Sequence, residues 1–276
     1  MAVDEDETYL LFLLSDSNLP TGSFVASSGL ESYITHAFGS RDSYERTVSF
    51  MHDNLASYAR SALPFVSDAH QLVSRYRSNS TTLEKSSVLS SLQSLDDLYE
   101  TMTLNHVARR ASKSQGVALL TLYSKGFSRP PSLPSISADA EEDQIVASIS
   151  DLVSQFKLYI RKDNTHGHLP ICWGILTAAL GLSLERSQYL HIFLQARSLL
   201  SASVRLNEIG PYGAQQILLH LSRPLVTSQV DRCKELRTGI LDDAVNESAN
   251  GPANTWPLGE ILATRHDLLH SRIFNS

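Results

Sequence analysis

The chain has 276 residues, of which 42% are hydrophobic and 19% are charged, so it can bury a large core and is not globally disordered. Its net charge of −6 gives no electrostatic reason to expect nucleic acid as a partner. The two cysteines, Cys172 and Cys233, are too few for a disulfide framework and form no Cys-x-x-Cys pair, which is typical of a reducing compartment.

Neither the start of the chain nor its longest uncharged stretch reads as a membrane or export signal. The start, MAVDEDETYLLFLL, carries acidic residues where a secretory signal needs basic ones. The stretch LPICWGILTAALGLS (169–183) is shorter than the roughly 20 residues that cross a membrane. We therefore predict a cytoplasmic protein without a membrane partner, in which 169–183 is a buried helix.

The first predicted helix covers residues 9–16, and an unusual turn follows it. Asn18 and Pro20 end the apolar run, because proline cannot continue a helix. The turn itself, LPTGSFVASSGLE (19–31), is polar and punctuated by glycine, although it lies between two apolar segments. A simple connection needs only one or two such residues, so the segment indicates a more specific role.

A short helix and then a long one are predicted after this turn. Apolar residues share one helix face at four-residue spacing, at Leu30, Ile34 and Phe38. Gly39 is placed to end that helix. Asp42 with Glu45 is a variant of the capping box, which predicts the start of the long helix. We expect the long helix to kink or restart at Pro64.

Helical periodicity continues through the rest of the chain. Residues 82–127 predict two helices with a junction near 99–105, and further helices are predicted over 227–246 and 258–270. The segment 189–206 predicts a central helix that exposes a narrow polar stripe, at His191, Gln195, Ser198, Ala202 and Arg205. No strand alternation exceeds four residues. The predicted fold is all-α, a helical bundle of roughly ten helices.

Two stretches interrupt this pattern. Residues 78–95 are rich in serine, and residues 128–144 contain three prolines followed by an acidic cluster. The apolar segments on both sides of 128–144 have the character of one core. We therefore predict a single domain over residues 1–276 with a mobile insertion at 128–144.

Histidine pairs are the main candidates for metal chemistry. His166 and His168 stand in the segment DNTHGHLP, while His266 and His270 are four residues apart, a spacing that places two imidazoles on one helix face. Neither pair has a further carboxylate or cysteine at a recognisable spacing. We interpret the first pair as a polar loop that caps the next helix and the second as a surface helix face, and we predict no metal or cofactor bound directly.

Motifs of nucleophilic or phosphate chemistry are also missing from the sequence. It contains no Gly-x-Ser-x-Gly and no Gly-x-x-x-x-Gly-Lys-Ser segment. Gly210, Pro211 and Gly213 are better interpreted as a helix break than as a phosphate-binding turn. The chain is therefore predicted not to be an enzyme.

The last segment, RHDLLHSRIFNS (265–276), is unusual for a chain end. Terminal residues are commonly polar and frayed, yet this segment keeps apolar residues and an arginine, at Leu268, Leu269, Arg272, Ile273 and Phe274. Such a composition indicates docking, either on the body of the same chain or on a partner.

Four segments, in order, resemble the urease accessory protein UreF family. LPTGSFVASSGLE is similar to the family's Leu-Pro-x-Gly-x-Phe…Gly-Leu-Glu signature, and SRIFNS with the preceding Arg-His-Asp is similar to its Ser-Arg-Leu-Phe-x-Ser ending. Between them, THGHLPICWGILTAALGL and RLNEIGPYGAQQILLHL resemble two further blocks of the family. The second block departs from the pattern at Ile209-Gly210-Pro211, and Ile273 stands where the family usually has leucine.

This resemblance implies an all-helical, non-enzymatic homodimer. It would work in a complex with the UreD/UreH scaffold protein and the UreG GTPase, and the complex would deliver nickel to apo-urease. The resemblance also implies partner-binding residues in the first turn and in the 265–276 tail, namely Leu19, Pro20, Gly22, Phe24, Gly29, Glu31, His266, Arg272, Ile273 and Phe274. We expect Gly22 to supply backbone freedom, and the hydroxyls of Ser23, Ser27 and Ser28 to satisfy amides at helix ends.

Two other functions stay open at this point. One is a metallochaperone that itself carries nickel through the histidine pairs, and the other is a helical scaffold unrelated to urease. Nickel binding by the isolated chain distinguishes the first alternative, and a lack of association with a GTPase or a urease precursor distinguishes the second.

Overall fold

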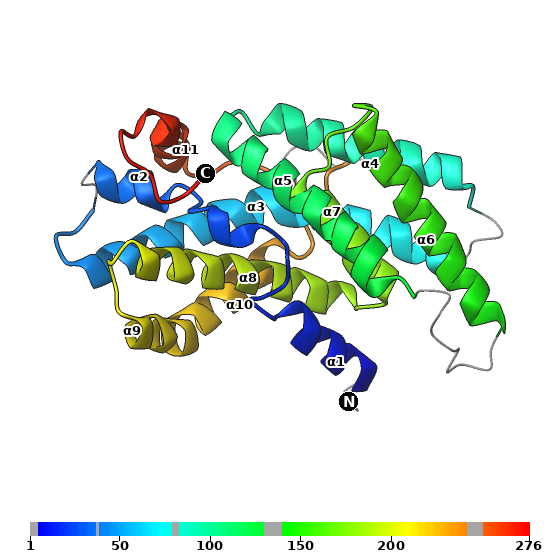
Figure 1. Cartoon of the computed structure of the whole chain (residues 1–276), viewed down its shortest axis with the longest axis horizontal. Helices are drawn as coiled ribbons and strands as arrows, with labels where there is room; N and C mark the ends of the chain where they lie inside the picture. The colour runs from blue at the N-terminus through cyan, green and yellow to red at the C-terminus, as the bar shows by residue number, and fades with distance from the viewer. Residues whose placement is uncertain (1–4, 37–38, 79–82, 130–139, 242–250) are drawn as a thin grey trace.

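A computed structural model describes residues 5–36, 39–78, 83–129, 140–241 and 251–276, and within these ranges the chain forms helices and no strand. The prediction of an all-helical fold of roughly ten helices is confirmed (Figure 1). In chain order the helices are α1 (Glu5–Leu14), α2 (Leu30–Thr35), α3 (Ser43–Ser78), α4 (Lys85–Met102), α5 (His106–Leu122), α6 (Ala140–Arg161), α7 (Leu169–Leu180), α8 (Leu184–Arg205), α9 (Pro211–Gln216), α10 (Arg223–Cys233) and α11 (Pro257–Thr264). Shorter 3₁₀ turns cover Ser23–Val25 and Arg265–Leu268, and π-helical turns cover Tyr123–Phe127 and Ile217–Ser222.

Helix α3 runs along the long axis of the molecule and packs against α4, α6, α7, α8 and α10 (Figure 1). We expected a kink or restart at Pro64, but α3 continues through this residue without a break. Proline lacks an N–H, so the carbonyl of Arg60 loses its helical partner. The N–H of Ala253 donates to that carbonyl instead, at 3.4 Å. Tertiary packing thus compensates for the proline.

The predicted buried helix is confirmed as α7. Every residue from Pro170 to Ala178 is buried, and the helix packs against α3 on one side and α5 on the other. None of the helices in the described part of the chain is long and apolar enough to span a membrane. The apolar run of α7 therefore serves the core.

Two predicted helix boundaries are correct in their main features. Residues 103–105 separate α4 from α5, and the Asn105 side chain caps α5 by accepting from the N–H groups of Val107 and Ala108 at 3.0 and 3.2 Å. At the start of α3, Asp42 accepts from the N–H of Glu45 at 2.9 Å. The Glu45 carboxylate binds the Ser40 hydroxyl at 2.7 Å, so only half of the capping box forms.

The predicted helices over 227–246 and 258–270 are both too long. Helix α10 ends at Cys233, and the backbone N–H and hydroxyl of Thr238 donate to the buried Asp68 carboxylate at 2.8 and 2.5 Å. These bonds hold the chain in a turn where helical periodicity alone would continue. Helix α11 ends at Thr264, a 3₁₀ turn follows to Leu268, and the rest of the tail has no helical structure.

The polar stripe predicted on α8 is not an exposed face. His191 and Ala202 are buried, and Gln195, Ser198 and Arg205 are half-buried. The stripe contacts the N-terminal segment: Gln195 Nε2 donates to Ser28 Oγ at 3.1 Å, and Arg205 Nη1 donates to the carbonyl of Phe24. The α8 side chains are polar because they bind this segment's polar groups.

One contiguous hydrophobic core includes residues from α1 to the C-terminal tail. The single domain over 1–276 and the mobile insertion at 128–144 stay predictions. Residues 130–139 of that insertion lie outside the described ranges, as do Phe38 and part of the predicted 227–246 helix. The acidic end of the insertion belongs to α6, which begins at Ala140, and most of the serine-rich stretch 78–95 belongs to α4.

Candidate functional site

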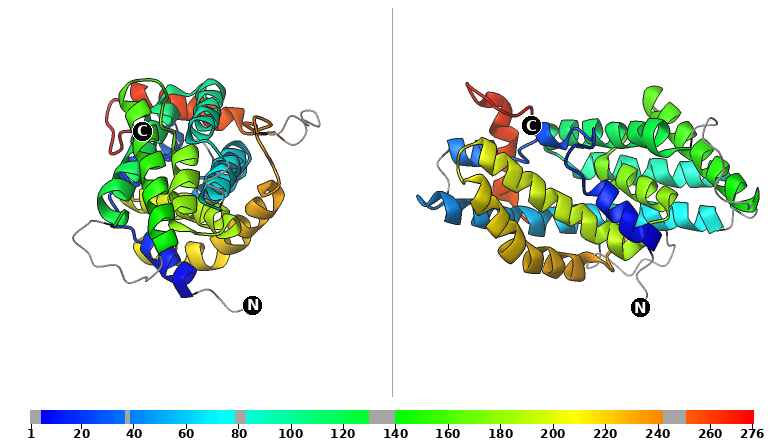
Figure 2. Two further views of the ribbon diagram at one scale, coloured as in Figure 1. Left: turned by 90° about the vertical axis from the view of Figure 1, so that its right-hand side faces the viewer. Right: turned by 60° about the horizontal axis from the view of Figure 1, so that its bottom comes forward.

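The first turn and the C-terminal tail, the two segments predicted to bind partners, lie against each other. The N–H of Ser27 donates to the carbonyl of Ser276 at 2.5 Å, and the N–H of Asn275 donates to the carbonyl of Val25 at 2.9 Å. In the right-hand view of Figure 2, the blue segment that follows α1 passes beside the C-terminal end of the chain. We call residues 22–31 together with 265–276 the terminal junction.

Glycine makes two features of this junction possible. Gly22 has φ 72° and Gly29 has φ 88°, both in the left-handed region that disfavours residues with a Cβ. A Cβ on Gly29 would lie 2.9 Å from the Cβ of Ala263, so α2 and α11 approach closely at this point. Nothing lies within 4 Å of a Cβ built on Gly22, which leaves the backbone torsion as the reason for that glycine.

A buried carboxylate, Glu31, holds the tail in place. Its two oxygens accept from the N–H groups of Ile273 and Phe274 at 2.6 and 3.1 Å. His266 is also fully buried, and its Nε2 lies 3.1 Å from the carbonyl of Phe274. Because a carbonyl oxygen can only accept, this Nε2 carries the proton. Nδ1 of His266 is then 3.8 Å from the Glu31 carboxylate, with no hydrogen bond to any described residue.

Arg205, at the end of α8, contacts both halves of the junction. Its guanidinium carbon lies 4.3 Å from the centroid of the Phe274 ring, a cation–π arrangement, and its Nη1 donates to the Phe24 carbonyl. Phe274 is buried. The tail is thus packed as part of the core and also bonded through its backbone.

A charged group on the outer side of the junction is centred on Asp267. The two Arg110 amino groups donate to its two oxygens at 2.9 Å each, and Arg272 Nη1 donates at 2.8 Å. Hydrogen bonds from Arg110 hold the pKa of Asp267 well below its usual range. Arg110 also donates to the carbonyl of Asn275 at 2.9 Å, so this ion-pair group fastens the tail to α5.

Of the ten residues predicted to bind partners, eight lie in this junction, and Leu19 and Pro20 directly precede it. Four are buried, namely Gly29, Glu31, His266 and Phe274, so they support the surface and do not form part of it. Four are exposed, namely Pro20, Phe24, Arg272 and Ile273, with Phe24 at 66% and Ile273 at 61%. Leu19 and Gly22 are half-buried.

The serine hydroxyls do not cap helix ends as we expected. Gly29 precedes α2, and the N–H of Leu30 donates to the Ser27 carbonyl at 3.1 Å rather than to a side chain. Ser27 Oγ is buried without a hydrogen-bond partner among the described residues, and Ser28 Oγ accepts from Gln195. The turn's polarity serves contacts with α8.

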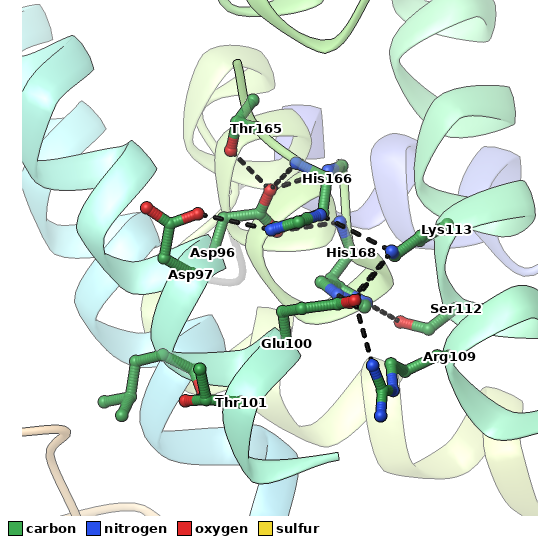
Figure 3. Close-up of polar contacts among 12 residues, drawn as sticks. Asp96, Asp97, Glu100, Thr101, Arg109, Ser112, Lys113, Thr165, His166 and His168 are labelled. Carbon is green, nitrogen blue, oxygen red and sulfur yellow. Dashed lines mark hydrogen bonds and ion pairs between the residues drawn. The ribbon is translucent and has the colours of Figure 1, made fainter. Parts of the chain in front are cut away.

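A second polar cluster surrounds the loop before α7 (Figure 3). The fully buried Asp96 carboxylate accepts from the Thr165 hydroxyl at 2.6 Å and from the N–H groups of His166, Gly167 and His168 at 2.7, 2.6 and 2.9 Å. The loop predicted to cap α7 is thus itself held by a carboxylate from α4. Sequence periodicity gave no signal for Asp96, because its partners are about 70 residues away.

His168 is buried in this cluster and has a polar partner at each ring nitrogen. Its Nε2 lies 2.7 Å from Glu100, and its Nδ1 lies 3.1 Å from Ser112 Oγ, which also accepts the N–H of Leu169. Burial lowers the pKa of His168, although Asp96 and Glu100 oppose this effect. Burial tends to raise the pKa of Glu100, but hydrogen bonds from Lys113, His168 and Arg109 outweigh it and lower that pKa to about 2.

The four residues of the two histidine pairs have different surroundings. His166 is half-buried and contacts Asp97 and Lys113, whereas His168 points into the cluster just described (Figure 3). His266 is buried in the 3₁₀ turn and His270 is exposed beyond its end, so the prediction that both lie on a surface helix face is wrong. Within the described ranges, no group of three or more histidine, cysteine, aspartate or glutamate side chains is arranged to hold a metal.

Comparison with known proteins places the chain in a family. The sequence model of the UreF family matches residues 44–222, more than half of the chain. The chain belongs to the UreF family of urease accessory proteins.

Similar proteins occur in fungi and in plants. Urease accessory protein 6 of Cryptococcus neoformans var. grubii is 40% identical over 311 aligned positions, which cover 98% of this chain and 97% of that protein. Urease accessory protein F of Arabidopsis thaliana is 31% identical over 264 positions, 95% of this chain and 90% of that protein. A UreF-like urease accessory protein of Schizosaccharomyces pombe is 29% identical over the full length of both chains.

The UreF block that departs from the family pattern has its own attachment in this structure. Glu208 forms an ion pair with Arg46, whose Nε donates at 2.9 Å, and the Tyr44 hydroxyl donates to the carbonyl of Gly213 at 3.0 Å. Tyr44 and Arg46 both lie in the first turn of α3. The residues on both sides of the interruption at 209–211 are therefore attached to the start of α3.

Proposed function

We propose that this UreF-family chain supports the maturation of urease by taking part in nickel insertion into apo-urease. It would act as an assembly protein rather than an enzyme, in a cytoplasmic complex with the UreD/UreH scaffold and the UreG GTPase. In that complex it would be a homodimer, with nickel and GTP bound by its partners.

The observation that carries this proposal is the terminal junction. It brings together the two segments with the family's most recognisable motifs and leaves apolar side chains exposed beside an arginine, at Phe24, Leu268, Ile273 and Arg272. Aromatic, aliphatic and arginine side chains are typical of the energetic centres of interfaces. Glu31 and His266 hold this surface from beneath, which lowers the ordering cost when a partner binds.

The test is co-purification of the chain with the cognate scaffold and GTPase. Ile273→Asp and Arg272→Ala are expected to abolish complex formation and urease activation, because each removes an exposed group from the junction. Their free energies of unfolding are expected to change by no more than about 0.5 kcal/mol, as is usual for exposed positions.

Val146→Asp on α6 is the matched control, since Val146 is also an exposed apolar residue but lies on a different helix from the junction. It is expected to leave the complex intact. If the junction variants stay folded and still bind both partners, the junction is not the partner surface.

The metallochaperone alternative is tested separately by calorimetric titration of nickel into the isolated chain. His166→Ala combined with His270→Ala removes the two partly accessible members of the histidine pairs. We expect neither the parent chain nor this variant to bind nickel tightly, because two imidazoles without further ligands make a loose site. Tight binding of one nickel per chain that is lost in the variant would favour the metallochaperone.

Light scattering tests the homodimer. A monomer mass at tens of micromolar protein would contradict this part of the proposal.

A further inference from the structure

A cavity of about 430 Å³ lies between the N-terminal segment, α8 and α9, and residues of α3, α5 and α7 complete its lining. This volume is within the range of about 300–1,000 Å³ that is typical of small-molecule sites. Protein interiors are closely packed, so a space of this size is unusual. Neither the fold nor the terminal junction requires it.

Much of the lining is apolar. Aliphatic and aromatic side chains from five segments face the space, including Leu14, Leu19, Leu194, Val204, Leu218 and Trp173. Tyr58 and His191 also line it, with rings stacked at 5.4 Å and a hydrogen bond of 3.0 Å between the hydroxyl and Nε2. Burial lowers the pKa of His191 to about 3, so this imidazole is neutral at physiological pH.

The charged side chains of the lining carry a net positive charge. Two guanidinium groups, Arg197 and Arg205, face one carboxylate, Asp16, among the described lining residues. Arg197 Nη1 donates to the Ser15 carbonyl, and the other donors of this guanidinium have no hydrogen-bond partner among the described residues. An apolar space with surplus guanidinium charge is complementary to a molecule that is apolar and carries one negative charge.

The donors of Arg205 are either bonded to backbone carbonyls or covered by neighbouring atoms. Its Nη1 and Nε donate to the carbonyls of Phe24 and Ser201, whereas Nη2 is buried with no hydrogen-bond partner in the described part of the chain. Because this nitrogen has no accessible surface, a ligand in the cavity meets the open donors of Arg197 instead, and a carboxylate oxygen would accept from them.

We propose that this cavity binds a small amphipathic carboxylate, such as a medium-chain fatty acid, with its hydrocarbon chain against the apolar lining and its carboxylate on Arg197. Because the N-terminal segment forms one wall and Arg205 also contacts Phe274, an occupied site would be in contact with the terminal junction. The inference concerns a ligand of this chain and holds whether or not the junction binds partners.

The test is calorimetric titration of the full chain with octanoate, octan-1-ol and octylamine, each below the concentration at which it aggregates. Octanoate is expected to bind once per chain. The alcohol and the amine are expected to bind about tenfold more weakly or not at all, since they lose the charge-assisted hydrogen bond. Equal affinity for octanoate and octan-1-ol, or no binding of octanoate, would overturn the proposal.

Two variants locate the site. Ser198 lines the cavity, is half-buried and makes no side-chain hydrogen bond to a described residue. Ser198→Trp is therefore expected to fill the space and abolish octanoate binding with the fold intact. Arg197→Gln is expected to weaken octanoate binding about tenfold while the affinity for octan-1-ol stays unchanged.

Arg232→Gln is the matched control, because Arg232 is an exposed arginine of α10 that does not line the cavity. It is expected to bind octanoate as the parent chain does. If a folded Ser198→Trp chain binds octanoate with unchanged affinity, the ligand occupies another place and the assignment is wrong.

Discussion

Gly22 is a residue whose role the sequence suggests and the torsion angle explains. It stands in the left-handed region at φ 72° just before the 3₁₀ turn Ser23–Val25. No neighbouring atom would meet a side chain at this position. The reason for glycine is therefore conformational rather than steric.

Gly22→Val is expected to lower the free energy of unfolding by about 1–2 kcal/mol, because a β-branched residue strongly resists positive φ. It is also expected to re-aim the turn that carries Phe24 and so to weaken complex formation. Urea unfolding and co-purification measure the two effects.

Gly210→Val is its matched control, since Gly210 is equally open but has φ −76°, a torsion that valine adopts readily. If the two variants are equally stable, the torsion at Gly22 does not carry the effect.

At the scale of elements, α7 is held between α3 and α5 by close contact at small residues. A Cβ on Gly174 would lie 2.7 Å from the carbonyl oxygen of Val66 on α3. The neighbouring atoms are backbone and a methyl group, so they cannot swing aside. Helices pack this closely only where one of them lacks a side chain.

Gly174→Ala is expected to lower the free energy of unfolding by about 2 kcal/mol or more, because it overpacks the helix crossing. Gly126→Ala is the control, since a Cβ there would meet only the flexible end of the Leu122 side chain, at 3.3 Å. Thermal unfolding of both variants decides the matter, and equal melting temperatures would contradict the close-packing argument.

The tail is attached to α2 by the Glu31 carboxylate, which makes a second prediction at this scale. Glu31→Ala leaves the N–H groups of Ile273 and Phe274 without acceptors, so the amides of residues 273–275 are expected to exchange with solvent faster than in the parent chain. Hydrogen-exchange mass spectrometry measures this rate. Unchanged exchange in the tail would mean that Phe274 packing alone holds it.

For the whole molecule, acid sensitivity follows from buried histidine. His191 has a folded pKa of about 3, because burial disfavours its charged form, against an ordinary value of 6.5. The unfolded chain therefore takes up a proton first. The stability that a neutral His191 supports is present above about pH 6.5 and is lost as the pH falls toward 3.

Between pH 6.5 and about pH 4, this effect is expected to lower the free energy of unfolding by about 3 kcal/mol. His191→Gln removes the titration, and its unfolding free energy is expected to fall less over the same range. His220→Gln, at an exposed position, is expected to follow the parent chain. Urea unfolding at a series of pH values checks the slopes, and parallel slopes for all three chains would refute the argument.

The sequence by itself determined the helical class, the buried character of 169–183, the α4–α5 junction and the need for glycine at position 22. Each of these depends on spacing or on residue type within a few positions, because periodicity and capping act within one or two helical turns. The order of the family motifs was also readable from the chain alone.

Only the tertiary structure decided where the terminal segments go and which polar residues are buried. Glu31 meets the tail across 242 residues, and Ser32 donates to the carbonyl of Leu262 across 230. The tertiary structure also decided that α10 ends at Cys233, because Asp68 on α3 fixes the turn that follows. It likewise decided that His266 is buried. These outcomes depend on which helices pack together. A buried polar group is stabilised by whatever donor or acceptor the fold brings to it, so no local sequence pattern predicts its partner.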